Sequence, residues 1–266
     1  MKVSGKVIVV TGAGGGIGQE LVINLLSKGA NVAAVDINKE SLEATVDRAG
    51  DKKDKLSTHI LNLTVREEVE ALPDQVISYH GVVDGIINNA GVIQPFVNVD
   101  ELDYDKIKFV MDVNFYGTLY MTKTFIPYLL ERPQAHITNI SSMGGFLPVP
   151  GQSIYGASKA AVKLMTEGLH SELKETKINV TIVIPGGVST NIMKNSGVEG
   201  PGGVSVEQGN TPKMFTPKEA AEDIVNGMEK DKYRILAGKD SKMMDLLYRF
   251  NPKRAAALIA QNMNFK

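Results

Sequence analysis

Cysteine is absent from this chain of 266 residues, and histidine occurs only four times. Without cysteine the chain can form no disulfide and can use no thiol chemistry. The histidines show no spacing that is typical of metal ligands, so we expect no metal site; they are His59, His80, His136 and His170. The lack of disulfides is typical of cytoplasmic proteins, and this is the location that we expect.

Long apolar runs and an excess of one charge are also absent. No segment approaches the roughly eighteen consecutive apolar residues of a membrane-spanning helix, so we expect no transmembrane segment. The 29 lysines and arginines nearly balance the 30 aspartates and glutamates, which argues against a surface that binds nucleic acid. A length of 266 residues, 43% of them hydrophobic, is sufficient for one α/β domain with a substantial core.

What the chain does contain is an alternation of short apolar stretches with helical ones. About seven stretches have the length and the β-branched composition of buried strands, near residues 6–11, 31–36, 56–62, 83–88, 135–141, 178–184 and 233–236. Helical stretches lie between them, among others near residues 39–49, 103–131 and 153–176. This alternation predicts a parallel sheet covered on both faces, that is, a single doubly wound α/β domain.

Some helix starts are marked by capping residues. Thr216 and Glu219 occupy capping-box positions around a proline, and they predict a helix that begins there. Thr64 and Glu67 have the same capping-box spacing, and Pro73 is expected to kink or split the helix that follows.

The first strand runs into a glycine-rich turn that precedes a helix. Gly12, Gly16 and Gly18 have the spacing Gly-x3-Gly-x-Gly, and in such a turn backbone N–H groups can hold a pyrophosphate. The turn alone is weak evidence, because many turns need glycine only for a positive φ. Here the second strand ends at Asp36, about 20 residues on, where an acceptor for ribose hydroxyls is expected. A phosphate-hydrolase loop is excluded, because no Gly-Lys-Ser/Thr follows.

A tyrosine and a lysine with four-residue spacing form the second informative feature. Tyr155 and Lys159 would lie on one face of a helix, with the ammonium beside the phenol. A cation about 4 Å away, at an effective dielectric of about 20, favours the phenolate by roughly 4 kcal/mol. This corresponds to about three pKa units, which would bring the phenol within reach of neutral pH as a general base.

The residues before Tyr155 distinguish this pair from a second one. Tyr104 and Lys108 have the same spacing but follow no strand with serines at its end, and we interpret them as a solvated helix face. Ser142, in contrast, directly follows an expected strand, at the carboxyl end where open α/β sheets bind their ligands. We therefore expect Ser142, Tyr155 and Lys159 to meet at one edge of the sheet.

Along nearly the whole chain, these motifs resemble those of the single-domain short-chain dehydrogenase/reductase family. The markers are the glycine turn at 11–18, Asp36, Asn88-Asn89-Ala90-Gly91, Asn114, Ser142, the Tyr155/Lys159 pair and Pro185-Gly186. The resemblance implies a Rossmann-type domain with about seven parallel strands and helices on both faces. Residues 1–110 would mainly bind the cofactor, and residues 111–266 would carry the catalytic groups.

The resemblance also implies a role for each matching residue. Tyr155 would be the general acid–base, Ser142 would bind the substrate oxygen, and Asn114 would hold a water through its helix backbone. Lys159 would bind the nicotinamide ribose and lower the pKa of Tyr155. Asn62 departs from the aspartate of many relatives, but an asparagine carbonyl can still accept from the adenine amino group. The residues expected to hold NAD are Gly12, Gly16, Ile17, Gly18, Asp36, Asn62, Leu63, Asn89, Ala90, Gly91, Tyr155, Lys159, Pro185, Gly186, Val188 and Thr190.

Two further segments leave alternatives open. Residues 190–212 are rich in glycine with scattered apolar residues. This pattern fits a lid over the substrate at least as well as it fits a passive surface loop. Residues 239–266 form a helical extension that is expected to pack on the core or on a subunit, with a membrane-surface helix as the alternative. The residues expected to line the substrate favour an uncharged or apolar small molecule: Met143, Gly144, Phe146, Ile192 and Met193.

The sequence thus predicts an oxidoreductase that transfers a hydride between NAD and a secondary alcohol or ketone, with Tyr155 as the general acid–base. Asp36 and the lack of a basic residue in the glycine turn favour NAD over NADP. The alternative enzyme is a 3-oxoacyl-carrier-protein reductase, which would normally need such a basic residue. A catalytically silent nucleotide-sensing protein on the same fold is the alternative outside enzymes. The resemblance further implies a homotetramer or homodimer, packed through the helices that carry Asn114 and Tyr155.

Overall fold

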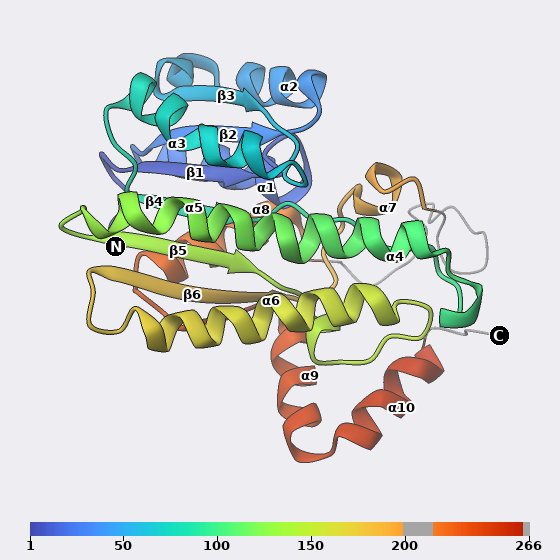
Figure 1. Ribbon diagram of the computed structural model, residues 1–266. Coiled ribbons are helices and arrows are strands. Elements are labelled where there is room, and N and C mark those ends of the chain that lie inside the picture. Colours follow the sequence, from blue (N-terminus) through green and yellow to red (C-terminus); the bar gives the residue numbers. More distant parts are fainter. Residues whose placement is uncertain (199–214, 263–266) are drawn as a thin grey trace.

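Seven parallel strands form one sheet in the computed structural model, which describes residues 1–198 and 215–262 (Figure 1). The strand order is β3-β2-β1-β4-β5-β6-β7. The bounds are β1 Val7–Thr11, β2 Asn31–Asp36, β3 Leu56–Ile60, β4 Gly85–Asn88, β5 Ala135–Ile140, β6 Ile178–Pro185 and β7 Arg234–Ala237. The predicted strands are confirmed, with ends shifted by a few residues at most. The order reverses between β1 and β4, and sheets of this kind bind ligands at the carboxyl strand ends beside such a point.

Helices cover both faces of the sheet, as predicted. One layer consists of α1 (Gly16–Ser27), α2 (Lys39–Ala49) and α8 (Pro217–Met228), and the other of α3 (Arg66–His80), α5 (Thr118–Leu130) and α6 (Ser153–Glu172). In β1, Ile8 and Val10 belong to the core under the first layer, and Val7 and Val9 to the core under the second. Because both faces are covered, every residue of β1 is buried and the strand is apolar at nearly every position.

The predicted helix over residues 103–131 is interrupted. It consists of α4 (Tyr104–Met111), a π-helical segment (η3, Asp112–Gly117) and α5, which follow one another without a loop. The π-helical segment contains Asn114, which is fully buried. A single wide turn leaves the helical spacing of apolar residues almost unchanged, so the sequence did not indicate it; such turns are frequent at functional sites.

The two predicted capping boxes have different outcomes. At α8 the box is confirmed: the Thr216 hydroxyl accepts from the Glu219 N–H at 3.2 Å, and the Glu219 carboxylate accepts from the Thr216 N–H at 2.9 Å. At α3 the prediction is wrong, because the helix begins at Arg66 and no side chain within residues 1–198 and 215–262 caps it. The Thr64 hydroxyl donates instead to the Asn62 side chain at 2.8 Å.

Pro73 lies inside α3 but does not split it. The helix runs on to His80, and Pro73 is buried together with Val69, Leu72 and Val76. Packing of this apolar face on the sheet offsets the backbone hydrogen bond that a proline removes from a helix.

Two helices follow β7 and pack against each other on the side of the sheet where β6 and β7 lie (Figure 1). They are α9 (Lys239–Phe250) and α10 (Pro252–Asn262). Their inner faces form a small core with the segment that follows β5, in which Met244 and Ala255 lie with Leu147. The inner face of the C-terminal stretch therefore packs on its own chain, while Phe250 on the outer face is 82% exposed.

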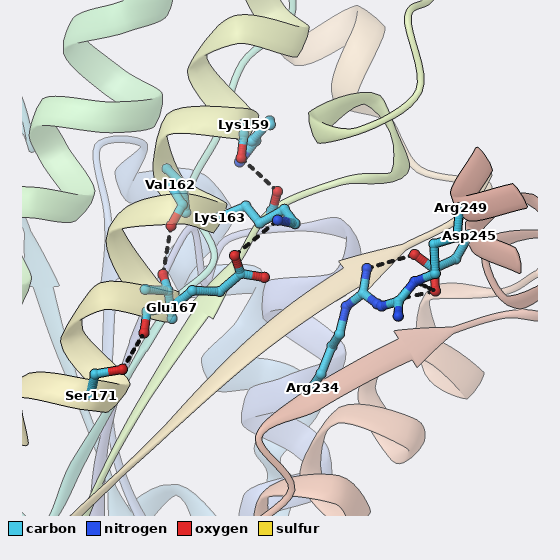
Figure 2. A network of polar contacts seen from close by, with 10 residues as sticks. Lys159, Val162, Lys163, Glu167, Ser171, Arg234, Asp245 and Arg249 are labelled. Atoms are coloured by element: carbon cyan, nitrogen blue, oxygen red, sulfur yellow. Dashed lines mark hydrogen bonds and ion pairs between the residues drawn. The ribbon is translucent and has the colours of Figure 1, made fainter. Parts of the chain in front are cut away.

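An ion-pair network attaches α9 to the sheet. Figure 2 shows Asp245 of α9 between two arginines. Arg234 of β7 donates to both carboxylate oxygens, at 2.7 and 3.0 Å, and Arg249, one helical turn beyond Asp245, lies 3.0 Å from the same group. Because a bidentate arginine–carboxylate pair is directional as well as strong, it holds α9 in a defined position on the edge strand.

Residues 199–214 and 263–266 lie outside the described part of the chain, and with them the larger part of the expected lid over 190–212. Of that segment, residues 190–198 are described, and they include the short helix α7 (Ile192–Asn195). Within the described ranges, no helix combines the length and the apolar character that crossing a membrane requires.

Candidate functional site

A cavity of about 560 Å³ opens at the carboxyl ends of the strands, beside the point where their order reverses. Its wall comes from the segments after β1 to β6 and from α7. Of the residues expected to hold NAD, the wall includes Gly12, Gly16, Ile17, Asp36, Asn62, Leu63, Asn89, Ala90, Gly91, Tyr155, Lys159, Pro185, Gly186, Val188 and Thr190. The remaining one, Gly18, lies directly behind the glycine turn. The fold thus brings residues from the whole length of the chain into one place.

The glycine turn is shaped so that only glycine fits at its key positions. Gly12 and Gly16 have φ values of 65° and 53°, in the left-handed region that other residues rarely adopt. A Cβ atom on Gly18 would overlap the carbonyl oxygen of Gly12, because α1 passes directly against the turn. No side chain of the described residues caps the N-terminus of α1, so its first backbone N–H groups can serve an anion in the cavity.

Asp36 ends β2 with its carboxylate held at the cavity wall. One carboxylate oxygen accepts from the Gly14 N–H at 2.9 Å, and the other accepts from the Asn38 N–H at 3.0 Å. Each oxygen keeps further acceptor capacity, so both can accept hydrogen bonds from the hydroxyls of a ribose.

The loop after β4 supports the glycine turn from the other side. The Thr11 hydroxyl accepts from the N–H groups of Asn89 and Ala90, at 3.0 and 3.1 Å. The Asn89 side chain in turn donates to the Thr11 carbonyl at 3.1 Å. Asn89 therefore stabilises the turn as well as lining the cavity.

Gly91, on the same loop, lies where Lys159 and Asn114 meet. A Cβ atom on Gly91 would be 3.0 Å from the Lys159 Nζ and 3.2 Å from the Asn114 Oδ1. The Asn114 side chain accepts from the Val92 N–H at 2.8 Å and donates to the Val92 carbonyl at 2.9 Å. It also donates to the Ser158 hydroxyl of α6 at 2.9 Å. Asn114 thus ties the loop after β4 to α6.

Ser142 and Tyr155 lie together at the end of β5. The Ser142 hydroxyl accepts from the Gly144 N–H at 3.1 Å, and a Cβ atom on Gly144 would be 3.3 Å from the Tyr155 ring. Burial raises the pKa of the Tyr155 phenol above its ordinary value of 10.0, and the hydrogen bond with the Ser142 side chain acts in the opposite direction. The phenol therefore keeps its proton at neutral pH.

The amine of Lys159 is held by a backbone carbonyl at the end of β5. It donates to the Ile140 carbonyl at 3.1 Å, and the residue is only 4% exposed. Burial lowers the pKa of Lys159 from 10.5 to about 8. The pKa of Tyr155 is governed by burial and by Ser142. Four-residue spacing places both side chains on one helix face, but the lysine turns to the end of β5.

Replacement of Lys159 by methionine is expected to stabilise the fold at neutral pH. The shift of the lysine pKa from 10.5 to about 8, at about 1.4 kcal/mol per unit, means that burial of the protonated amine costs up to about 3 kcal/mol. Below pH 8 the amine is protonated in both folded and unfolded chains, so the full gain applies. As the pH rises from about 8 to 10.5, the folded chain sheds this proton first, and the gain should fade. Urea unfolding near neutral pH and again near about pH 10 measures both values.

Lys163→Met is the matched control for this prediction. Lys163 lies one turn further along α6 and pairs with Glu167 at 2.9 Å closer to the surface (Figure 2). Its loss should change the free energy of unfolding by no more than about 1 kcal/mol at either pH. A Lys159→Met protein less stable than the wild type at neutral pH would show that the contacts of the buried amine outweigh its desolvation.

Asn62 reaches the cavity. Its side-chain oxygen was expected to be free, but it is already hydrogen-bonded. It accepts from the Thr64 N–H at 3.0 Å and from the Thr64 hydroxyl at 2.8 Å. These two bonds fill both lone pairs of the amide oxygen. The side chain can therefore offer an adenine only its N–H groups, which suit the acceptor nitrogens of the ring rather than its amino group.

The loop after β6 is held from behind by Asp240, which the sequence did not indicate. This carboxylate, in the first turn of α9, accepts from the Gly187 N–H at 2.7 Å, and a Cβ atom on Gly186 would overlap it. Asp240 thus explains why residue 186 is a glycine. An acid in the first turn of a helix is too common to point to such a role, and only the fold brings the two segments together.

Only some of the residues expected to line the substrate site lie at the cavity. Ile192 lies in the cavity wall, and Gly144 lies beside Ser142 and Tyr155. Phe146 packs instead with the C-terminal helices, its ring centroid 5.6 Å from that of Tyr248, and Met143 belongs to the same small core. Met193 is not among the described residues of the cavity wall. Polar residues that the sequence did not indicate complete the wall, among them Ser41, Asn191 and Asn195.

Known proteins resemble this chain in sequence. The sequence pattern of the family described as short chain dehydrogenase matches residues 6–199. SadH of Mycobacterium tuberculosis is 36% identical over 269 residues, which cover 96% of this chain and 94% of SadH. The 3-oxoacyl-(acyl-carrier-protein) reductase FabG of Thermotoga maritima is 35% identical over 192 residues, which cover 71% of this chain and 77% of FabG.

Solved structures show the same fold. A short-chain dehydrogenase/reductase of Burkholderia phymatum in complex with NAD has a TM-score of 0.85 at 24% identity, with 96% of both chains covered. Structures similar to this chain include NADP complexes as well as NAD complexes. Both the sequence pattern and the relatives lead to the same assignment: the chain belongs to the short-chain dehydrogenase/reductase family of oxidoreductases.

Proposed function

We propose that this protein uses NAD to interconvert a secondary alcohol and the corresponding ketone. The observation that carries the proposal is the position of Ser142, Tyr155 and Lys159 in the wall of the cavity that also contains the glycine turn and Asp36. A protein that only senses a nucleotide has no need for a hydroxyl, a phenol and an amine in this arrangement.

The residues around the cavity fit a nicotinamide dinucleotide. Two features suit a pyrophosphate: the glycine turn, on which α1 packs so closely that a side chain at Gly18 would overlap the Gly12 carbonyl, and the uncapped N-terminus of α1. Asp36 would accept from the adenosine ribose, and Lys159 would donate to the nicotinamide ribose. Val188 and Thr190 would contact the nicotinamide end. When bound, the nicotinamide supplies a hydride donor or acceptor for the substrate carbon.

The proton chemistry would belong to Tyr155. During reduction the phenol would give its proton to the substrate oxygen. During oxidation it would first lose that proton to water, and the resulting phenolate would take the proton of the substrate hydroxyl. The Ser142 hydroxyl, which shares a hydrogen bond with the phenol, would hold the substrate oxygen. Lys159, with a pKa of about 8, can gain or lose a proton close to neutral pH. The Asn114 carbonyl, which accepts from the Thr118 hydroxyl at 2.8 Å, would hold a water in a proton relay.

A panel of secondary alcohols and ketones, assayed by nicotinamide absorbance with both cofactors, tests the proposal. Turnover of uncharged or apolar members would support it. Tight NADH binding without turnover of any member would favour a nucleotide-sensing protein instead.

The similarity to FabG favours a 3-oxoacyl-carrier-protein reductase as the second candidate. The residues of the glycine turn argue against it, because Ala13, Gly14 and Gly15 offer no positive charge to the 2′-phosphate of NADPH. Reduction of a 3-oxoacyl thioester decides between the two. If the thioester with NADPH is turned over faster than every simple ketone, the second candidate replaces the first.

The protein is expected to prefer NAD(H) over NADP(H). A 2′-phosphate would lie against the carboxylate of Asp36, and like charges about 4 Å apart near a surface cost up to roughly 4 kcal/mol before solvent screening. Calorimetric titration measures the Kd of each cofactor, and Asp36→Ala should bring the ratio of the two Kd values closer to one. Asp47→Ala, an exposed change of the same charge on α2, should leave the ratio unchanged. Equal or tighter binding of NADPH to the wild type would show that Asp36 does not face the ribose.

The protein is expected to be a homodimer or homotetramer that packs through α4, η3 and α6. Large apolar side chains on these elements remain exposed, since Phe109 is 45%, Tyr116 42% and Leu164 70% exposed. Light scattering at micromolar concentration should give a multiple of 28.7 kDa. Leu164→Arg should lower that mass, whereas Met243→Arg, at a 60% exposed position of α9, should not. A wild-type mass near 28.7 kDa would contradict the expectation.

A further inference from the structure

Helix α6, which carries Tyr155, begins without a cap of its own. Its N-cap residue, Gln152, makes no side-chain cap hydrogen bond. In most helices a side chain at the N-cap position accepts from the second or third N–H of the helix. In α6 these are the N–H groups of Ile154 and Tyr155, so the proposed catalytic tyrosine is itself one of the residues whose backbone needs an acceptor.

A distant residue, Gln94, supplies that acceptor. Its side-chain oxygen accepts from the Ile154 N–H at 2.8 Å and from the Tyr155 N–H at 2.9 Å. Its side-chain amide donates to the Gly151 carbonyl at 2.9 Å, and its own carbonyl accepts from the Gln152 side chain at 2.8 Å. Gln94 is fully buried, so each of these bonds is shielded from competing water.

Gln94 belongs to the loop after β4, which also contacts two other parts of the cavity. The same loop supports the glycine turn through Asn89 and lies against Lys159 at Gly91. The cap therefore connects the part of the cavity that would hold the cofactor with the first turn of the helix that presents the phenol.

We propose that Gln94 is a positioning residue for Tyr155, acting as the N-cap of α6 from another part of the chain. The inference rests on the proposed function, because it assigns Gln94 to the placement of the proton carrier. Without the two hydrogen bonds, the first turn of α6 frays and the phenol no longer keeps a fixed position relative to Ser142. Misplacement of a catalytic group by about 1 Å can cost on the order of a hundredfold in rate.

Gln94→Met tests the role, because methionine has a similar length and neither donates nor accepts the bonds in question. We expect kcat to fall by roughly tenfold to a hundredfold, with the KM of the substrate and the Kd of NADH within about twofold of wild type, since neither ligand is held by Gln94. Gln152→Met is the matched control: this buried glutamine donates one bond to Gln94 and none to α6. Gln94→Glu keeps the acceptor oxygen and should recover a large part of kcat.

Amide hydrogen exchange of the NADH-bound wild type gives a readout that needs neither turnover nor a variant. The amides of Ile154 and Tyr155 should exchange at least roughly tenfold more slowly than those of Glu67 and Glu68. These two glutamates occupy the same helical positions in α3, where no side chain caps the helix.

Each outcome decides one question. Equal exchange at the two helix starts, or a kcat of Gln94→Met no lower than that of Gln152→Met, would overturn the role of Gln94. If the panel shows no turnover at all, the proposed function fails, and exchange still decides whether Gln94 caps α6. If Gln94→Met does not fold, Gln94→Glu and the hydrogen exchange of the wild type provide the test. A low kcat of Gln94→Glu, although its Ile154 and Tyr155 amides are protected from exchange, would show that the cap does not position Tyr155.

Discussion

Replacement of Tyr155 by phenylalanine is expected to reduce turnover by roughly 10²–10⁴-fold, the usual scale of general acid–base catalysis. The substitution keeps the ring, which packs beside Gly144, and removes only the hydroxyl that would carry the proton. Cofactor binding should therefore stay close to that of the wild type. Steady-state kinetics with an active member of the alcohol panel, together with fluorescence titration of NADH, measure the two quantities separately.

Tyr104→Phe is the control for this result. Tyr104 has the same four-residue spacing to a lysine, but it is 88% exposed, and Lys108 pairs with Asp112. This variant should keep the wild-type rate. A Tyr155→Phe protein that retains about a tenth of wild-type activity would exclude Tyr155 as the general acid–base, because that loss falls far short of the expected scale.

The second large effect is expected from Gly18→Ala. The added methyl group would overlap the Gly12 carbonyl oxygen and press on the Asn89 side chain, both of which belong to the proposed cofactor cradle. Forced overpacking of this kind costs roughly 1–3 kcal/mol, and α1 can relieve it only by moving away from the turn. NADH affinity should therefore fall by roughly tenfold to a hundredfold. Fluorescence titration of NADH measures it, with thermal unfolding of the same sample to show that the variant is folded.

Gly168→Ala provides the comparison, since it is the same substitution inside a helix. In the part of the chain that the structure describes, no atom lies within 4 Å of a Cβ atom at Gly168, so alanine should stabilise α6 by roughly 0.5–1 kcal/mol and leave NADH affinity unchanged. If Gly18→Ala binds NADH as tightly as the wild type, the close approach of α1 to the turn is not needed for binding.

The strands and the start of α8 could be predicted because each depends on a short stretch of chain. The strand Val7–Thr11 is apolar at nearly every position, and this pattern leaves few alternatives to a central parallel strand. Thr216 and Glu219 similarly mark the start of α8, since both halves of the capping box lie within one turn. The placement of Tyr155 near Ser142 followed from two such local predictions and the rule that parallel strands end at the same edge.

The sequence did not indicate which partner a group binds when it has a choice between two. Thr64 could serve the first turn of α3 or the Asn62 side chain, and it binds the second. Lys159 could approach the phenol of Tyr155 or a backbone carbonyl of β5, and the carbonyl holds its amine. Spacing along a helix gives the direction of a side chain, but the partner that it binds depends on residues elsewhere in the chain. Gln94 and Asp240 escaped prediction for the same reason, because each acts on a segment far away in sequence.

The overlap between Gly186 and Asp240 restricts how this sequence can vary. A side chain at position 186 and the carboxylate at position 240 compete for the same volume, and loss of the carboxylate alone leaves the Gly187 N–H without its acceptor. Single substitutions at position 186 or at position 240 are therefore each expected to be destabilising. A paired exchange, alanine at 186 with a smaller residue at 240, should be tolerated better than alanine at 186 alone, because the smaller residue makes room for the added methyl group. The bidentate contact between Arg234 and Asp245 keeps α9 in place during such an exchange, so position 186 can gain a side chain only together with a change at position 240.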